Sequence, residues 1–224
     1  MLYKTGGIVF KFIKYRETSV IVTVFTESFG TQTYLVNNVR TKKPTIAIAL
    51  FQPLTLLEMV VYHKENANMN RVSEIKCSDP FFSIPYNLQK TAIALFISEI
   101  LYKAIRHESH PSEVFHFIKA SLLSFDNLGD NFENFHLQFL LKLTRYLGFY
   151  PESAIELKEQ LILGNLNSNE DLDSFLLNNY DKTIKITNKQ RRILLKSIID
   201  YYRLHIESMG NINSYNILYE VIGK

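Results

Sequence analysis

Residues 2–40 read LYKTGGIVFKFIKYRETSVIVTVFTESFGTQTYLVNNVR, and this stretch decides the fold of the first part of the chain. Its apolar and polar residues alternate, as expected of strands whose successive side chains point to opposite faces. The run 20–26 is rich in β-branched residues, which suit a pleated surface. Gly30 supplies a tight turn, because glycine accepts a positive φ, and the run 31–36 pairs back. The stretch predicts consecutive antiparallel strands, the first with Ile8, Phe10 and Phe12 on one face and Val9, Lys11 and Ile13 on the other.

Two further strands are predicted at 54–63 and 71–77, joined by a polar loop of hairpin composition at 64–70. Residues 45–51 are expected to form a short helix or a buried bridge. Five strands without parallel crossovers predict a small closed or partly open barrel over residues 1–79. The five-stranded OB-fold is the natural candidate, and an SH3-like barrel is the alternative.

The period of the apolar residues changes from two to 3.6 at Asn87, which is the expected N-cap of a first helix. Gly148 is the expected end of the most apolar helix. Residues 80–224 are therefore expected to form an all-α helical domain, which makes the chain an α+β protein of two domains. The acidic segment 152–187 is predicted to be irregular, apart from one short helix. The expected helices are 87–106, 112–125, 132–147, 171–178, 188–209 and 214–221.

Charge is unevenly distributed along the chain. Residues 1–43 carry a net charge of +5 and residues 188–224 a net charge of +3, whereas the residues between them are net acidic. Clustered lysine and arginine are typical of a surface that binds a polyanion. Tyr15 and Tyr34 lie among these cations in the sequence and are candidates for stacking on nucleic-acid bases. A solvated strand face with ordinary lysines is the alternative interpretation.

Sequence signatures of catalysis and of metal binding are absent. The chain has no Walker A, G-x-G-x-x-G or G-x-S-x-G pattern, and its histidines do not pair at metal-ligand spacing. Cys77 is the single cysteine, which rules out a disulfide or a cysteine-based zinc site within the chain. Neither a membrane span nor a signal peptide is indicated. We therefore expect a cytoplasmic protein that is not an enzyme and uses no cofactor or metal.

The stretch from Thr5 to Arg40 resembles the bacterial RecO family of recombination mediators. So do QPLTLLEMVVYHK at 52–64, FLLKLTRYLGFYP at 139–151 and LLKSIIDYYRLHI at 194–206. The resemblance spans nearly the whole chain and implies an N-terminal OB-fold with a helical C-terminal domain. It is strongest to the shorter members, because many relatives carry a four-cysteine zinc module where residues 152–187 here hold no cysteine.

The resemblance implies a mediator of DNA repair and recombination. Such a protein binds single- and double-stranded DNA, anneals complementary strands and, with RecR, helps to load RecA onto DNA coated by single-strand binding protein (SSB). It is expected near the nucleoid. The predicted DNA-binding set consists of seven cations and the stacking candidate Tyr34. Its members are Lys4, Lys11, Lys14, Arg16, Tyr34, Arg40, Lys42 and Lys43. The predicted groove for the acidic SSB tail consists of Phe139, Lys142, Leu143 and Arg145.

Two other functions fit the same charge pattern. One is an adaptor whose barrel binds peptides, with incidental contact to DNA. The other is an OB-fold factor that binds RNA. An adaptor that docks apolar peptides should bind with little dependence on salt, whereas a nucleic-acid site should be strongly salt-dependent.

Overall fold

The computed structural model describes residues 1–41, 46–64, 67–106, 110–151, 153, 155–156, 159 and 169–222. It divides into two compact units, and neither is one continuous stretch of chain. The first comprises Met1–Phe82 with Ile105–Leu122, and the second comprises Ser83–Ala104 with Leu123–Lys224. Each unit is described by itself. The predicted boundary at residue 79 stays a prediction.

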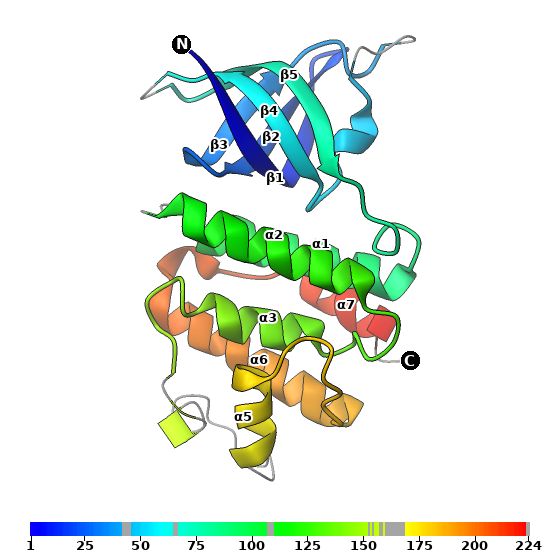
Figure 1. Cartoon of the computed structure of the whole chain (residues 1–224), viewed down its shortest axis with the longest axis vertical. Coiled ribbons are helices and arrows are strands. Elements are labelled where there is room, and N and C mark those ends of the chain that lie inside the picture. Colours follow the sequence, from blue (N-terminus) through cyan, green and yellow to red (C-terminus); the bar gives the residue numbers. More distant parts are fainter. Residues whose placement is uncertain are drawn as a thin grey trace. The chain divides into compact units, whose positions relative to one another are not determined.

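The first unit contains a closed five-stranded barrel, visible in blue to green in Figure 1. The strands follow one another around it in the order β1-β2-β3-β5-β4. Only β3 and β5 pair in parallel, and every other pair of neighbours is antiparallel. This is the predicted OB-fold. The elements are β1 (Leu2–Tyr15), β2 (Ser19–Thr26), β3 (Gly30–Val36), the short 3-10 helix η1 (Ile48–Phe51), β4 (Leu56–Tyr62) and β5 (Asn70–Asp79).

Strand β1 forms a seam on each side, and a bulge lies within the seam to β2. Residues 2–8 pair with β4, while residues 7–15 pair with β2, and the register to β2 shifts between Val9 and Lys11. Because a bulge adds one residue to one strand, the alternation of faces is interrupted there. Val9 and Phe12 consequently both pack in the barrel core. The predicted alternation through this point, with Phe12 opposite Val9, was wrong for this reason.

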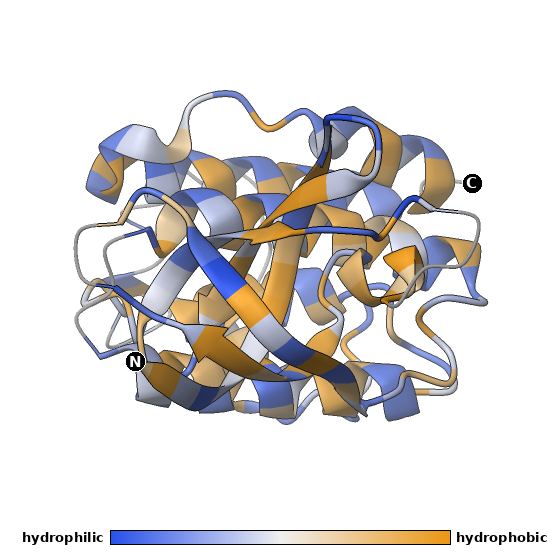
Figure 2. Ribbon diagram, turned by 90° about the horizontal axis from the view of Figure 1, so that it is seen from above, coloured by the Kyte–Doolittle hydropathy of each residue, from blue (hydrophilic) through white to orange (hydrophobic). Residues whose placement is uncertain are grey.

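The barrel core is built from three valines of β2 together with residues of β1, β3, β4 and η1. Hydrophobic and hydrophilic residues alternate along individual ribbons in Figure 2, as expected for elements with one buried and one exposed face. Gly7 lies where β1 comes closest to its neighbours, because a Cβ there would lie 2.8 Å from both Met59 Sδ and Val24 Cγ1. The fully enclosed residues are Val9, Val20, Val22, Val24, Tyr34, Val36, Val39, Phe51, Leu57, Met59 and Val61.

The first part of helix α2 (Pro111–Asn127) packs on the barrel within the first unit. Lys119 Nζ lies 2.7 Å from the Asp79 carboxylate, and His116 Nε2 lies 3.2 Å from that of Glu27. The Thr31 hydroxyl donates a hydrogen bond of 3.0 Å to the carbonyl of Ile105. These contacts cover one rim of the barrel. We call the end of the barrel at Lys14, Tyr15 and Arg16, where both cations are exposed, the open end.

The second unit is helical, and the helices that start at Leu88 and Phe135 are buried over much of their circumference. The expected N-cap Asn87 is confirmed, since its Oδ1 accepts hydrogen bonds from the backbone N–H groups of Gln89 (2.9 Å) and Lys90 (3.1 Å). Gly148 adopts a φ of +81° at the predicted stop. Besides the end of α2, the elements are α1 (Leu88–Ala104), α3 (Phe135–Leu143), α5 (Asn169–Leu177), α6 (Asn188–His205), the 3-10 helix η2 (Glu207–Met209) and α7 (Ser214–Ile222).

Helices α3 and α6 are shorter than predicted. After Leu143 the chain tightens into successive turns, with the N–H of Tyr146 bonded to the carbonyl of Leu143. Helix α6 ends at His205 and is followed by η2 rather than by further α-helix. Within the described residues, no helix is long and apolar enough to cross a bilayer.

The close approach at Gly7 predicts that Gly7→Ala destabilises the protein. The added methyl group forces Met59 and Val24 apart, and such overpacking typically costs about 1–3 kcal/mol. Urea unfolding should show a lower midpoint than in the wild type. Gly129→Ala is the matched control, because nothing lies within 4 Å of a Cβ at that position. Equal midpoints for the two variants would contradict the packing described here.

His136 predicts acid sensitivity of the helical unit. Burial, with a smaller contribution from the Arg191 charge, lowers the pKa of His136 to about 3. In the unfolded chain a histidine titrates near 6.5. Below about pH 6.5, His136 binds a proton in the unfolded chain but stays neutral in the folded chain. The free energy of unfolding therefore falls as the pH drops toward 3. Urea unfolding at pH 7 and pH 5 should show this loss, and His136→Leu should reduce it.

Candidate nucleic-acid interface

An apolar row crosses the outer face of the barrel. Ile13 on β1 pairs with Ile21 on β2, which pairs with Leu35 on β3. Their sequence neighbours Val20, Val22, Tyr34 and Val36 face the core, so these three side chains face outward. Ile13 is 56% exposed, and the other two are half-buried. We call Ile13, Ile21 and Leu35 the apolar row.

Exposed cations flank the apolar row. Lys11 lies in the adjoining outer row, opposite Thr23, and Arg71 pairs with Leu35 from β5. Lys14 pairs with Val20, whose side chain faces the core. Because Lys14 is itself exposed, its side chain emerges at the end of the barrel. This end therefore combines apolar surface with positive charge.

The turn after β1 brings two of the predicted arginines together. Arg40 Nη1 donates a hydrogen bond of 3.2 Å to the carbonyl of Arg16. The carbonyl of Thr18 accepts from the backbone N–H groups of Val39 and Arg40, both at 3.0 Å. The Arg16 guanidinium lies 5.3 Å from the centre of the Tyr15 ring. A cation stacked on a half-exposed aromatic ring next to the open end is suited to contact both phosphates and bases.

Lys4 is placed differently from the other predicted cations. Its ammonium group lies 2.8 Å from the carboxylate of Glu58, which Lys76 also contacts at 3.2 Å. The hydrogen bond with Glu58 raises the pKa of Lys4, and the hydrogen bonds from Lys4 and Lys76 lower the pKa of Glu58. Lys4 lies in the part of β1 that pairs with β4, away from the seam with β2 that carries the apolar row. Its charge is therefore partly neutralised and lies outside the apolar row.

Tyr34 corrects a sequence-based expectation. Its side chain is fully buried in the barrel core, its hydroxyl has no hydrogen-bond partner among the described residues, and burial raises its pKa. A ring in this position has no face to offer to a base. The burial follows from the register between β2 and β3, because Tyr34 is the cross-strand partner of Val22, which faces the core. Lys42 and Lys43 lie outside the described residues.

The predicted groove on the helical unit is largely filled. Phe139 and Leu143 are fully buried and do not line an open surface. Lys142 donates a hydrogen bond of 2.6 Å to the carbonyl of Asn178 and lies 4.3 Å from the centre of the Tyr180 ring. Its partial burial lowers its pKa. Of the four predicted residues, Arg145 is the exposed one, and its guanidinium lies 4.8 Å from the centre of the Tyr150 ring.

Sequence reasoning missed the apolar row and Arg71. Ile21 alternates with the valines of β2, so the sequence puts it on the other face of the strand. Without the register, however, the sequence does not show which of the two faces is buried in the core. Among the described residues, no group of three or more His, Cys, Asp or Glu side chains is placed to hold a metal ion. Because Cys77 is the chain's single cysteine, its residues do not fit a four-cysteine zinc module.

Two family models match the chain in the order of its two regions. The model for the N-terminal part of recombination protein O matches residues 1–81, and the model for its C-terminal part matches residues 85–155. The chain belongs to the RecO family of DNA repair proteins. Curated relatives with that name include those of Flavobacterium psychrophilum, at 38% identity, and Bacteroides fragilis, at 36% identity. Each alignment covers 99% of this chain and 99% of the relative.

Membership of the RecO family gives the chain a role in DNA repair and recombination. It also agrees with the resemblance inferred from the sequence. The match extends over the barrel and over most of the first helices, so the open end of the barrel lies within the matched region. The family does not by itself assign a role to any single side chain.

Proposed function

We propose that this RecO-family chain binds single- and double-stranded DNA at the open end of its barrel and anneals complementary strands. The observation that carries the proposal is the combination of the apolar row with exposed Lys11, Lys14 and the Arg16–Arg40 pair. Cations neutralise phosphates, while apolar and aromatic side chains support unstacked bases. Such a surface holds a strand through its backbone and does not read its sequence.

The mediator role extends this proposal beyond DNA contact. Together with RecR, the chain helps to load RecA onto single-stranded DNA that is coated by SSB. Family membership and the absence of any catalytic pattern in the sequence support an action by binding and not by covalent chemistry. An annealing protein of this kind needs to shield the charge of two strands at once, and the cations of the barrel are suited to do so.

A contact with the SSB tail is proposed at the end of α3. The tail is acidic, so an exposed cation beside an aromatic ring is a suitable receptor for it. Arg145 over Tyr150 meets this description, and Lys142 adds positive charge nearby. The burial of Phe139 and Leu143 gives them the role of a packed support under these residues.

The DNA contact predicts a loss of affinity in the double variant Lys11→Ala/Lys14→Ala. Each phosphate contact on a single strand contributes about 0.7 to the slope of log affinity against log salt, so the slope should fall by roughly 1.4. Fluorescence anisotropy of a labelled single-stranded oligonucleotide at several salt concentrations measures both quantities. Annealing of complementary oligonucleotides should slow in the same variant.

Lys4→Ala/Lys76→Ala is the matched control for this test. It removes the same charge from the same barrel, but both lysines are paired with Glu58. Its affinity and salt slope should stay close to those of the wild type. Equal losses in the two double variants would mean that net charge, and not the open end of the barrel, governs binding.

The SSB contact predicts that Arg145→Ala weakens binding of a peptide with the SSB tail sequence several-fold, because the exposed charge is lost. Isothermal titration with the full-length chain measures the affinity. Arg106→Ala, which removes another exposed arginine, is the control for nonspecific attraction. Unchanged affinity in Arg145→Ala would remove this residue from the tail site.

A peptide-binding adaptor is the second candidate, and the exposed Ile13 favours it. An apolar peptide docked on the apolar row would bind with little dependence on salt, unlike DNA. The same titrations therefore separate the two functions. Competition between RNA and DNA oligonucleotides of equal sequence separates the RNA-binding alternative.

A further inference from the structure

Helix α6 carries a basic face that the barrel interface does not involve. Lys189, Arg192, Lys196 and Arg203 recur at helical spacing on its exposed side. The opposite side is buried through residues such as Leu195 and Tyr202. Asp200 interrupts the basic face and lies 2.8 Å from Arg203. The stretch from Arg192 to Arg203 spans about 16 Å of helix, enough to face several phosphates of a strand.

A groove runs between this face and the start of α7. Its volume is about 500 Å³. Within the described residues, none of its lining side chains is acidic. Two lining residues are cationic, three carry amides and one is aromatic: Lys196, Arg203, Asn211, Asn213, Asn216 and Tyr215. Amide and ammonium groups both donate hydrogen bonds to phosphate oxygens.

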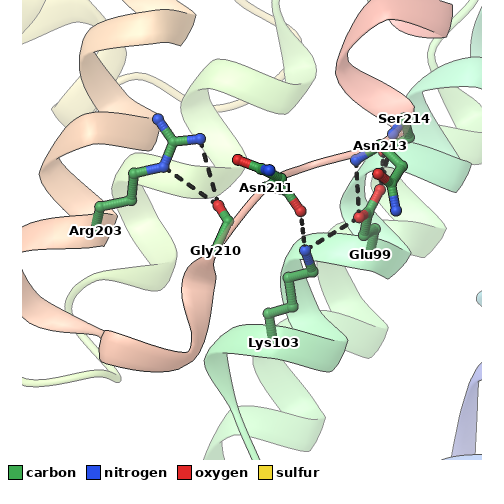
Figure 3. A network of polar contacts seen from close by, with 7 residues as sticks. All are labelled: Glu99, Lys103, Arg203, Gly210, Asn211, Asn213 and Ser214. Carbon is green, nitrogen blue, oxygen red and sulfur yellow. Dashed lines mark hydrogen bonds and ion pairs between the residues drawn. The ribbon is translucent and has the colours of Figure 1, made fainter.

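The loop that forms one wall of the groove is held in place from both sides (Figure 3). Arg203 on α6 donates to the carbonyl of Gly210 through Nε and Nη2, each at 3.3 Å. On α1, the Glu99 carboxylate accepts from the backbone N–H groups of Asn213 (3.0 Å) and Ser214 (2.8 Å), and Lys103 donates to the carbonyl of Asn211. The wall is therefore fixed before any ligand arrives, which lowers the entropic cost of binding.

An aromatic pair has one of its two rings in the groove. The ring centres of Tyr215 and Tyr219 lie 4.6 Å apart in an edge-on arrangement. The Arg192 guanidinium lies 4.7 Å from the centre of the Tyr219 ring. Tyr215 is half-buried and lines the groove next to Lys196. Cations along a helix with an aromatic side chain between them match the two requirements of single-strand binding, a backbone track and a stacking platform.

We propose that the groove between α6 and α7 binds a single strand of DNA, with a phosphate on Lys196 and a base against Tyr215. The proposal rests on the proposed function and adds a second DNA contact that belongs to the helical unit. An acidic peptide fits less well, because the donors extend along the helix and a stacking ring lies among them. Two contacts on one chain allow it to hold two segments of DNA, as strand annealing requires.

The test is ultraviolet cross-linking of the full-length chain to a single-stranded oligonucleotide that contains 5-iodouracil, followed by mass spectrometry of the linked peptides. We expect a cross-link at Tyr215. It should persist in the barrel variant Lys11→Ala/Lys14→Ala, which separates this contact from the barrel. In parallel, Lys196→Glu should weaken binding of the oligonucleotide about tenfold at low salt, because attraction becomes repulsion. Lys182→Glu is the matched control on the same unit, since Lys182 is exposed and lies outside the groove.

Each outcome decides between distinct conclusions. Cross-links confined to the barrel, with equal affinities for Lys196→Glu and Lys182→Glu, would overturn the groove contact and leave the proposed function intact. If the wild type does not bind the oligonucleotide at all, both the groove contact and the proposed function are overturned. Displacement of the Tyr215 cross-link by an acidic peptide, but not by unlabelled DNA of equal charge, would assign the groove to a peptide and overturn the proposal.

Discussion

Barrel closure depends on one strand that serves two neighbours. Strand β1 pairs with β4 along its first half and with β2 along its second half. The two seams overlap at Gly7 and Ile8, and the bulge between Val9 and Lys11 follows within the seam to β2. The bulge increases the local twist, which lets a single strand turn from one partner to the next. Gly7 allows the close approach that this turn requires. The core valines of β2 and the exposed positions between them follow from the register that β1 sets.

The same constraint decides which cations remain available on the surface. Before the bulge, Lys4 lies over β4 and is paired with Glu58. Beyond it, Lys11 and Lys14 lie along the seam with β2, beside the apolar row. Lysines that look equivalent in the sequence therefore have different electrostatic surroundings. Lys11 and Lys14 are exposed, and together with Arg16 and Arg40 they place positive charge beside the apolar row.

Much of the fold could be predicted from local patterns, but the site could not. Strand and helix positions follow from apolar periodicity, and Asn87 marks the start of α1 by its local chemistry. The bulge at Phe10 and the enclosure of Tyr34 depend on register and on closure, which act between residues far apart in the sequence. The Lys4–Glu58 pair and the groove at α7 likewise depend on residues that are far apart in the sequence. The hydrogen bond from Lys142 to the carbonyl of Asn178 could not be predicted either, because it forms only where α3 packs beside the end of α5.

The anchoring of the loop before α7 has a consequence for how the chain folds. Glu99 and Ser214 are 115 positions apart in the sequence, so their contact closes a very long loop. Contacts of this separation form late, because the chain must lose much of its freedom before they stabilise it. The wall of the groove is therefore among the last parts of the helical unit to be completed.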